Sequence, residues 1–219
     1  MNKIDGQEYV LLPVMIDTGR YFMVNRFLFL YREASIGALF FLPALLFLNR
    51  YRFRNTQKTF LYCIFCYYLS GMYAAAGLPN VIRRTFYPRL NLIPFQYMFS
   101  DWENTLLNLL LFIPLGLLLP ILWRPFQKLL RVILLGLGTS LLIELLQLFT
   151  YRATDINDLM TNTLGSALGY GAFRILRLRS SPDIQENHTH TLPILVLIVV
   201  LAMYFLQPLV SRLLYLLCC

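Results

Sequence analysis

Long apolar stretches joined by short basic loops constrain this chain more than any other feature. About 20 apolar helical residues cross the hydrocarbon core of a bilayer, and helices satisfy their own backbone there. The chain is 58% hydrophobic and only 14% charged, well below the charged content of about 25% that is usual for a soluble domain. The sequence therefore predicts an all-α, polytopic transmembrane helix bundle of about six spans. These cover residues 34–48, 60–77, 105–123, 129–149, 159–176 and 192–217.

The N-terminal region fits this pattern less well. Residues 9–16 and 21–30 are apolar, but Asp17 and Arg20 separate them, so we expect an interfacial or re-entrant segment there. These patterns predict how the chain is divided. We expect an N-terminal interfacial segment (1–33), two spans (34–89), a three-helix core (90–176), and a cytoplasmic linker with the last span (177–219).

Basic residues in the connecting loops indicate an orientation. Cytoplasmic loops of membrane proteins carry an excess of Lys and Arg. The loops at 49–59, 124–128 and 174–191, with their flanks, hold ten basic residues, against five in the loops of the opposite side. The N-terminal segment would add four basic residues to that opposite side, and we leave it out of the count. We therefore expect a multi-pass cell-membrane protein whose 152–155 loop faces outside.

The distribution of charge along the chain argues against a nucleic-acid partner, and the Cys and His residues give no clear metal site. The formal net charge of +8 is spread over short loops and not gathered in a basic patch, so no nucleic-acid partner is expected. Cys63 and Cys66 lie within an apolar run and fit buried cysteines better than a metal site. His188 and His190 lie in a polar linker with no further ligand nearby in the sequence.

Polar residues recur on one face of three successive predicted helices. In each helix they are spaced by three or four residues, which places them on one side. The third and fifth spans run in the same direction and the fourth runs opposite, so Asn108, Glu144 and Asn162 lie at a similar depth, about 10 Å from one surface. We expect these faces to converge in one polar layer. The sets are Asp101, Asn104 and Asn108; Glu144 and Gln147; and Asp155, Asp158 and Asn162.

Structural roles account for part of this layer. Asp155 is placed to cap a helix, with Asp158 in its first turn, and Asn104 and Asn108 are suited to hydrogen bonds between helices. Gly165 and Gly169 form a Gly-x-x-x-Gly pair that favours close helix packing. None of this explains Glu144, an acid well inside an apolar helix. It is the candidate catalytic residue if the protein has one.

Four linked motifs resemble the VanZ-like family of bacterial membrane proteins. The resemblance covers about residues 90–173 and implies functional candidates at Asn91, Asn108, Glu144, Gln147, Arg152, Asp155, Asp158 and Asn162. It also implies a link to low-level resistance to teicoplanin, a glycopeptide antibiotic that binds cell-wall precursors. The motifs are Asn91-Leu-Ile-Pro-Phe95; Asn104-x-x-x-Asn108 with Phe112-Ile-Pro-Leu-Gly116; Glu144-x-x-Gln147; and Arg152-Ala-Thr-Asp155-Ile-Asn-Asp158 with Asn162-Thr-x-Gly165.

Three functions remain open at this point. The first is a protein that binds a lipid-linked cell-wall precursor or a glycopeptide at the outer leaflet, with membrane lipid around it. The second is an enzyme acting on a lipid-linked substrate, with a divalent cation held by candidates Glu144, Asp155 and Asp158. The third is a proton-coupled transporter. An apolar groove beside the polar layer favours the binding protein, whereas a metal ion with phosphate favours the enzyme.

Overall fold

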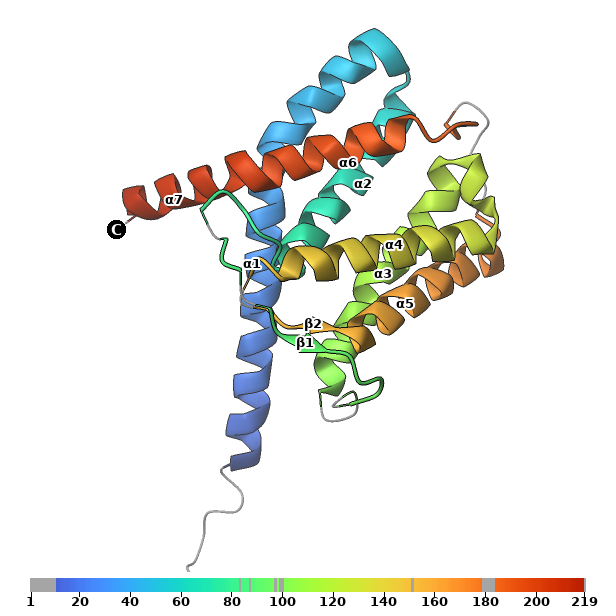
Figure 1. Cartoon of the computed structure of the whole chain (residues 1–219). Coiled ribbons are helices and arrows are strands. Elements are labelled where there is room, and N and C mark those ends of the chain that lie inside the picture. The colour runs from blue at the N-terminus through green and yellow to red at the C-terminus, as the bar shows by residue number, and fades with distance from the viewer. Residues whose placement is uncertain are drawn as a thin grey trace, which may run out of the picture.

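The computed structural model describes residues 11–82, 84–86, 88–96, 98, 101–150, 152–178 and 184–218. Its helices pack as a bundle (Figure 1), which confirms the all-α prediction. Short π-helical turns follow α1 and α6, at Asn49–Phe53 and Ala202–Leu206, and a 3-10 turn at Arg124–Gln127 precedes α4. The helices are α1 (Leu11–Leu48), α2 (Thr56–Ala75), α3 (Trp102–Leu122), α4 (Leu129–Gln147), α5 (Ile156–Ile175), α6 (Thr191–Leu201) and α7 (Gln207–Cys218).

Four helical segments in the described part of the chain are long and apolar enough to cross a membrane. They are Phe27–Phe53, Trp102–Leu122, Leu129–Gln147 and Thr191–Leu214. The expected spans at 60–77 and 159–176 correspond to the 20-residue helices α2 and α5, which do not reach the same apolarity. Asn157, Asp158 and Asn162 make the start of α5 polar, and α3 and α4 pack against that helix.

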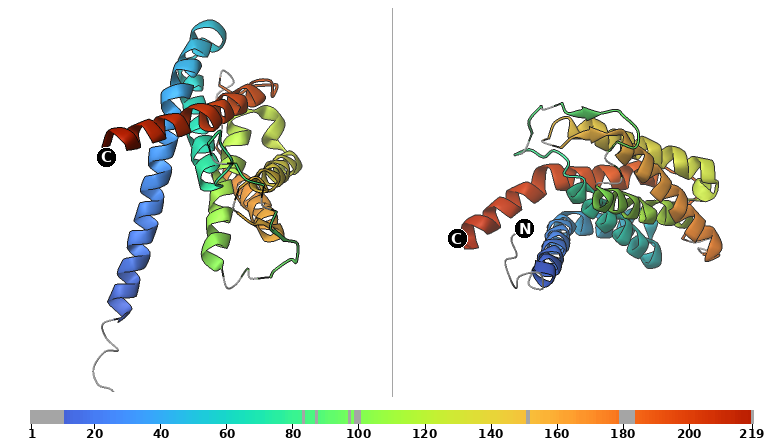
Figure 2. Two further views of the ribbon diagram at one scale, coloured as in Figure 1. Left: turned by 60° about the vertical axis from the view of Figure 1, so that its left-hand side comes forward. Right: turned by 90° about the horizontal axis from the view of Figure 1, so that it is seen from below.

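The first helix is longer than the sequence pattern predicted. Leu11–Leu48 is one helix of 38 residues, with a length of about 57 Å at 1.5 Å per residue. A re-entrant loop is therefore not formed in residues 11–33, and the expected boundary after residue 33 falls inside α1. Asp17 and Arg20 interrupt the apolar run, but neither breaks a helix as Pro does. The N-terminal half of α1 extends away from the other helices (Figure 2).

Helices α3 and α5 form the tightest contact in the bundle. Alanine Cβ atoms built at Gly165 and Gly169 would lie 2.3 Å from the carbonyl oxygen of Leu109 and 2.0 Å from that of Ile113. Both contacts join residues 56 positions apart, so the two helices run parallel, as expected. The Gly-x-x-x-Gly pair thus lets the two backbones touch.

A polar network closes the end of the bundle where α3 ends and α6 begins. It is buried at Trp123 and Thr191 and half-buried at Lys58 and Glu186. Trp123, fully buried, donates from Nε1 to Thr191 Oγ1 at 2.9 Å, and Lys58 Nζ pairs with Glu186 Oε1 at 2.7 Å. Burial alone would raise the pKa of Glu186, but hydrogen bonds from Lys58, Thr191 and Tyr62 outweigh it and hold the pKa below the ordinary value. The linker before α6 is therefore anchored to α2 and α3.

Candidate functional site

A short parallel strand pair brings together the loops that lead into α3 and α5. β1 (Leu90–Asn91) pairs with β2 (Thr154–Asp155), so that Asn91 faces Asp155 in register. The Thr154 amide also donates to the Arg89 carbonyl at 2.8 Å. Both loops thereby close over the end of α4, where Glu144 and Gln147 lie.

Glu144 is tied to this loop by its carboxylate and its backbone. It is 3% exposed, and its Oε2 accepts a hydrogen bond from the Asp155 amide at 2.9 Å. The Thr154 hydroxyl donates to the Glu144 carbonyl at 2.9 Å. One carboxylate oxygen therefore positions the loop, while Oε1 takes part in no hydrogen bond found among the described residues.

Asp155 caps α5, as its position in the sequence predicted. Its Oδ1 accepts from the Asn157 amide at 2.8 Å, and its Oδ2 accepts from Asn91 Nδ2 at 3.0 Å. Asn157, which is buried, accepts from the Phe95 amide at 2.7 Å and donates to the Gln96 carbonyl at 2.9 Å. These bonds fix the loop before α3 onto the start of α5.

Gln147 and Arg152 connect the same region to the end of α2. Gln147 Nε2 donates to the Ala76 carbonyl at 2.8 Å, and Arg152 Nη1 donates to the Ala75 carbonyl at 2.7 Å. Gly77 adopts a left-handed φ of 61°, and a Cβ there would lie 3.0 Å from Arg152 Cδ. Arg152 thus folds back over the layer, and its guanidinium acts electrostatically on both Glu144 and Asp158.

A small cavity between α2, α3, α4 and α5, here called the polar crevice, lies at the centre of this layer. Its volume is about 10 Å³. Asn162 Nδ2 donates to Ser140 Oγ at 2.9 Å, but Asn162 Oδ1 and Gln147 Oε1 are buried with no hydrogen-bond partner among the described residues. The polar residues that line the crevice are Asn108, Glu144, Gln147, Arg152, Asp158 and Asn162.

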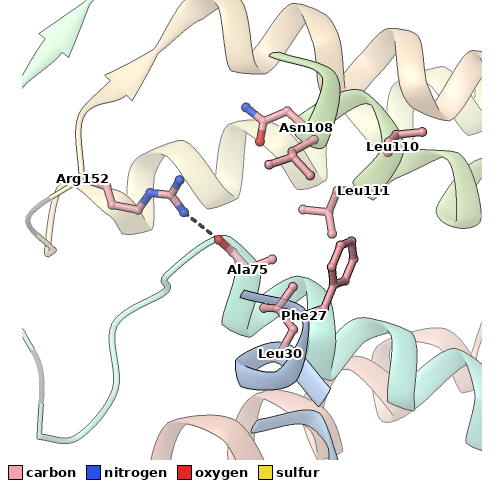
Figure 3. Close-up of a pocket in the computed structure, with 8 residues that line it drawn as sticks. Phe27, Leu30, Ala75, Asn108, Leu110, Leu111 and Arg152 are labelled. Atoms are coloured by element: carbon pink, nitrogen blue, oxygen red, sulfur yellow. Dashed lines mark hydrogen bonds between the residues drawn. The ribbon is translucent and has the colours of Figure 1, made fainter. Parts of the chain in front are cut away.

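A larger cavity of about 210 Å³ opens beside the polar crevice (Figure 3). Asn108 and Arg152 lie toward one end of it, and the apolar side chains of Phe27, Leu30 and Leu111 lie toward the other. Leu107, Leu110 and Ala75 complete its lining. Its walls come from α1, α2, α3 and the loop that carries Arg152, so the cavity joins an apolar space to the polar layer.

Comparison with known proteins shows the family to which this region belongs. The VanZ/LLP1 family profile matches residues 59–177. These include most of α2, all of α3 to α5, the loops that join them and the polar residues of both cavities. The chain belongs to the VanZ/LLP1 family. It is similar to Protein VanZ of Enterococcus faecium, with 38% identity over 81 residues, which are 36% of this chain and 49% of the relative. The chain thus matches about half the length of that relative, and no solved structure matches.

The VanZ/LLP1 region brings most of the predicted site residues together, but not all of them. Asn104 remains at the exposed start of α3, where its Nδ2 donates to both Asp101 carboxylate oxygens at 2.9 and 2.8 Å. Asp155 lines neither cavity. The three metal candidates Glu144, Asp155 and Asp158 do not form a metal site by themselves. The described residues contain no group of three or more His, Cys, Asp or Glu residues that could hold a metal ion. Both oxygens of Asp155 are used within the loop.

Sequence patterns alone did not identify several residues that shape the VanZ/LLP1 site. Asn157 was passed over, although it stands between Asp155 and Asp158 and its amide has the groups to bond a neighbouring loop. Ser140 was not identified as the hydrogen-bond partner of Asn162. Phe27 and Leu30 carry no local signal for their role, because only the packing of α1 brings them to the cavity.

Proposed function

We propose that this protein is a VanZ-like integral membrane protein of the cell envelope that binds a lipid-linked or amphipathic ligand at the outer leaflet. In this proposal it is associated with resistance to glycopeptides of the teicoplanin type. The observation that carries the proposal is the cavity of about 210 Å³, which is apolar toward one end and polar toward the other.

The lining chemistry supports a ligand with two unlike parts. Phe27, Leu30 and Leu111 provide an apolar surface for an acyl or isoprenoid chain. Arg152 and Asn108 provide hydrogen-bond donors for a polar head group. Because pockets that enclose a drug-sized ligand usually measure about 300–1,000 Å³, this cavity suits one part of an amphipathic molecule at the junction of its chain and head.

Filling the cavity is expected to abolish ligand binding. Leu111→Trp places a larger side chain in the cavity, whereas Leu106→Trp adds the same side chain to α3 at a residue that is 42% exposed and outside the lining. Binding of radiolabelled teicoplanin and of a polyprenyl diphosphate is measured with the full chain in lipid nanodiscs. We expect saturable binding of at least one probe, a loss of at least about tenfold in affinity for Leu111→Trp, and little change for Leu106→Trp.

Comparison of Leu111→Trp with Leu106→Trp decides whether the cavity is the binding site. If neither probe binds the wild-type protein, or if Leu111→Trp binds as well as Leu106→Trp, the cavity is not the binding site. The comparison between the two probes also separates the glycopeptide from the lipid-linked precursor as the ligand.

The orientation in this proposal is tested by single-cysteine labelling. Ala153, which is exposed, lies beside the end of α4, and His188, also exposed, lies near its start. In a background without the native cysteines, we expect a membrane-impermeant maleimide to label Ala153→Cys in intact cells. His188→Cys should be labelled only after the membrane is permeabilised. The reverse result would place the polar layer at the cytoplasmic side.

A further inference from the structure

We infer that the polar crevice is a binding site for one divalent cation, coordinated by oxygens of Glu144, Gln147, Asp158 and Asn162. The inference does not depend on the proposed amphipathic ligand, because none of these four residues lines the larger cavity. Three observations carry it: the unpartnered oxygens, the excess of acidic over basic side chains, and the size of the crevice.

The unpartnered oxygens come from two side chains that are each 4% exposed. Gln147 uses its Nε2 on the Ala76 carbonyl and Asn162 uses its Nδ2 on Ser140 Oγ. Each amide therefore leaves its oxygen buried and without a partner among the described residues, and both residues line the same crevice. Buried oxygens of this kind are unfavourable unless a donor or a cation satisfies them.

The carboxylates add charge to the same place. Glu144 has one oxygen bonded to the Asp155 amide, and Asp158 lines the same crevice beside Asn108. Arg152 also lines the crevice and acts on both acids. The ion pairs found in the described residues do not include it, however, and its Nη1 donates to a backbone carbonyl. With Asp155 included, three acids face one arginine, so acidic side chains outnumber basic ones in the polar layer.

The volume of the crevice and the oxygen atoms that line it indicate which ligand fits. A volume of about 10 Å³ corresponds to one water-sized occupant. A water molecule would satisfy the two amide oxygens but leave the charge in place, whereas a divalent cation satisfies both. Carboxylate and amide oxygens are the ligands that Ca²⁺ and Mg²⁺ prefer, and these four side chains supply both kinds.

The test measures cation binding with no amphipathic ligand present. The chelator-treated full chain in nanodiscs is titrated separately with Ca²⁺, Mg²⁺ and Mn²⁺ by calorimetry, and Mn²⁺ binding is followed by electron paramagnetic resonance. We expect one saturable site for at least one of these ions. Glu144→Gln and Asp158→Asn should each weaken binding by at least about tenfold, because each removes a charged ligand.

A matched control and a second readout keep the result interpretable. Glu103→Gln removes an exposed carboxylate from the first turn of α3, outside the crevice, and should bind the ion as the wild type does. The ion should raise the unfolding temperature of wild type and Glu103→Gln more than that of Glu144→Gln. Absence of saturable binding to the wild type, as for a crevice that holds water only, would overturn the inference. Equal binding by wild type, Glu144→Gln and Asp158→Asn would do the same.

Discussion

Replacing Gly169 by alanine is expected to destabilise the protein by about 3 kcal/mol or more, while the same change at Gly171 is not. An alanine Cβ at position 169 would lie 2.0 Å from the Ile113 carbonyl oxygen and 3.0 Å from Gly116 Cα. These are backbone atoms, so α3 and α5 would have to separate. At Gly171 no atom lies within 4 Å of the new Cβ, and helix propensity favours alanine by about 1 kcal/mol.

Unfolding of the purified variants in mild detergent measures this difference. Gly169→Ala should unfold at a lower temperature or accumulate poorly in the membrane, and Gly171→Ala should behave like wild type or better. Equal stability of the two variants would mean that α3 and α5 do not touch through their backbones at this position.

Replacing Glu144 by glutamine is expected to abolish function while the protein still folds and accumulates. A glutamine oxygen can still accept the hydrogen bond from the Asp155 amide, which is 2.9 Å from Glu144 Oε2, so the loop keeps its anchor. Only the negative charge is lost. If this charge holds a cation or moves a proton, its removal should return a sensitive bacterium to the teicoplanin susceptibility of cells without the protein.

Two further variants separate the possible causes of that loss. Asp158→Asn should be similarly harmful if a cation is essential, and mild if Asp158 acts only at the helix terminus, because asparagine keeps the hydrogen-bonding groups. Glu103→Gln is the control for loss of an exposed carboxylate. A Glu144→Gln protein that accumulates normally and confers full resistance would contradict the central role of this residue and leave the polar layer as a packing feature.

Much of the site could be predicted from the spacing of polar residues along the sequence. Polar residues three, four or seven positions apart must share a helix face, and the layer accordingly contains Asn108, Glu144, Gln147, Asp158 and Asn162 around one crevice. The N-cap role predicted for Asp155 is confirmed by its bond to the Asn157 amide. Such features depend only on helix geometry and on residues close in the sequence.

Other features depend on contacts between distant residues. The bond of Gln147 to the Ala76 carbonyl and the reach of Arg152 to Ala75 join segments more than 70 residues apart. The continuous helix through residues 11–33 was also not predicted, because a break in hydropathy is not a break in backbone hydrogen bonding. Residue patterns report which face of a helix is polar, but not which neighbour meets it.

The sequence by itself determined the helical class, the membrane setting and most residues of the polar layer, because burial of apolar area and the helical repeat are local properties of the chain. Only the tertiary structure decided that Phe27 and Leu30 of α1 line a cavity with Arg152. It also decided that Gln147 and Asn162 each leave a buried oxygen in the polar crevice. The physical reason is that a cavity is the space several helices leave between them, and packing, not the composition of any one helix, determines its shape.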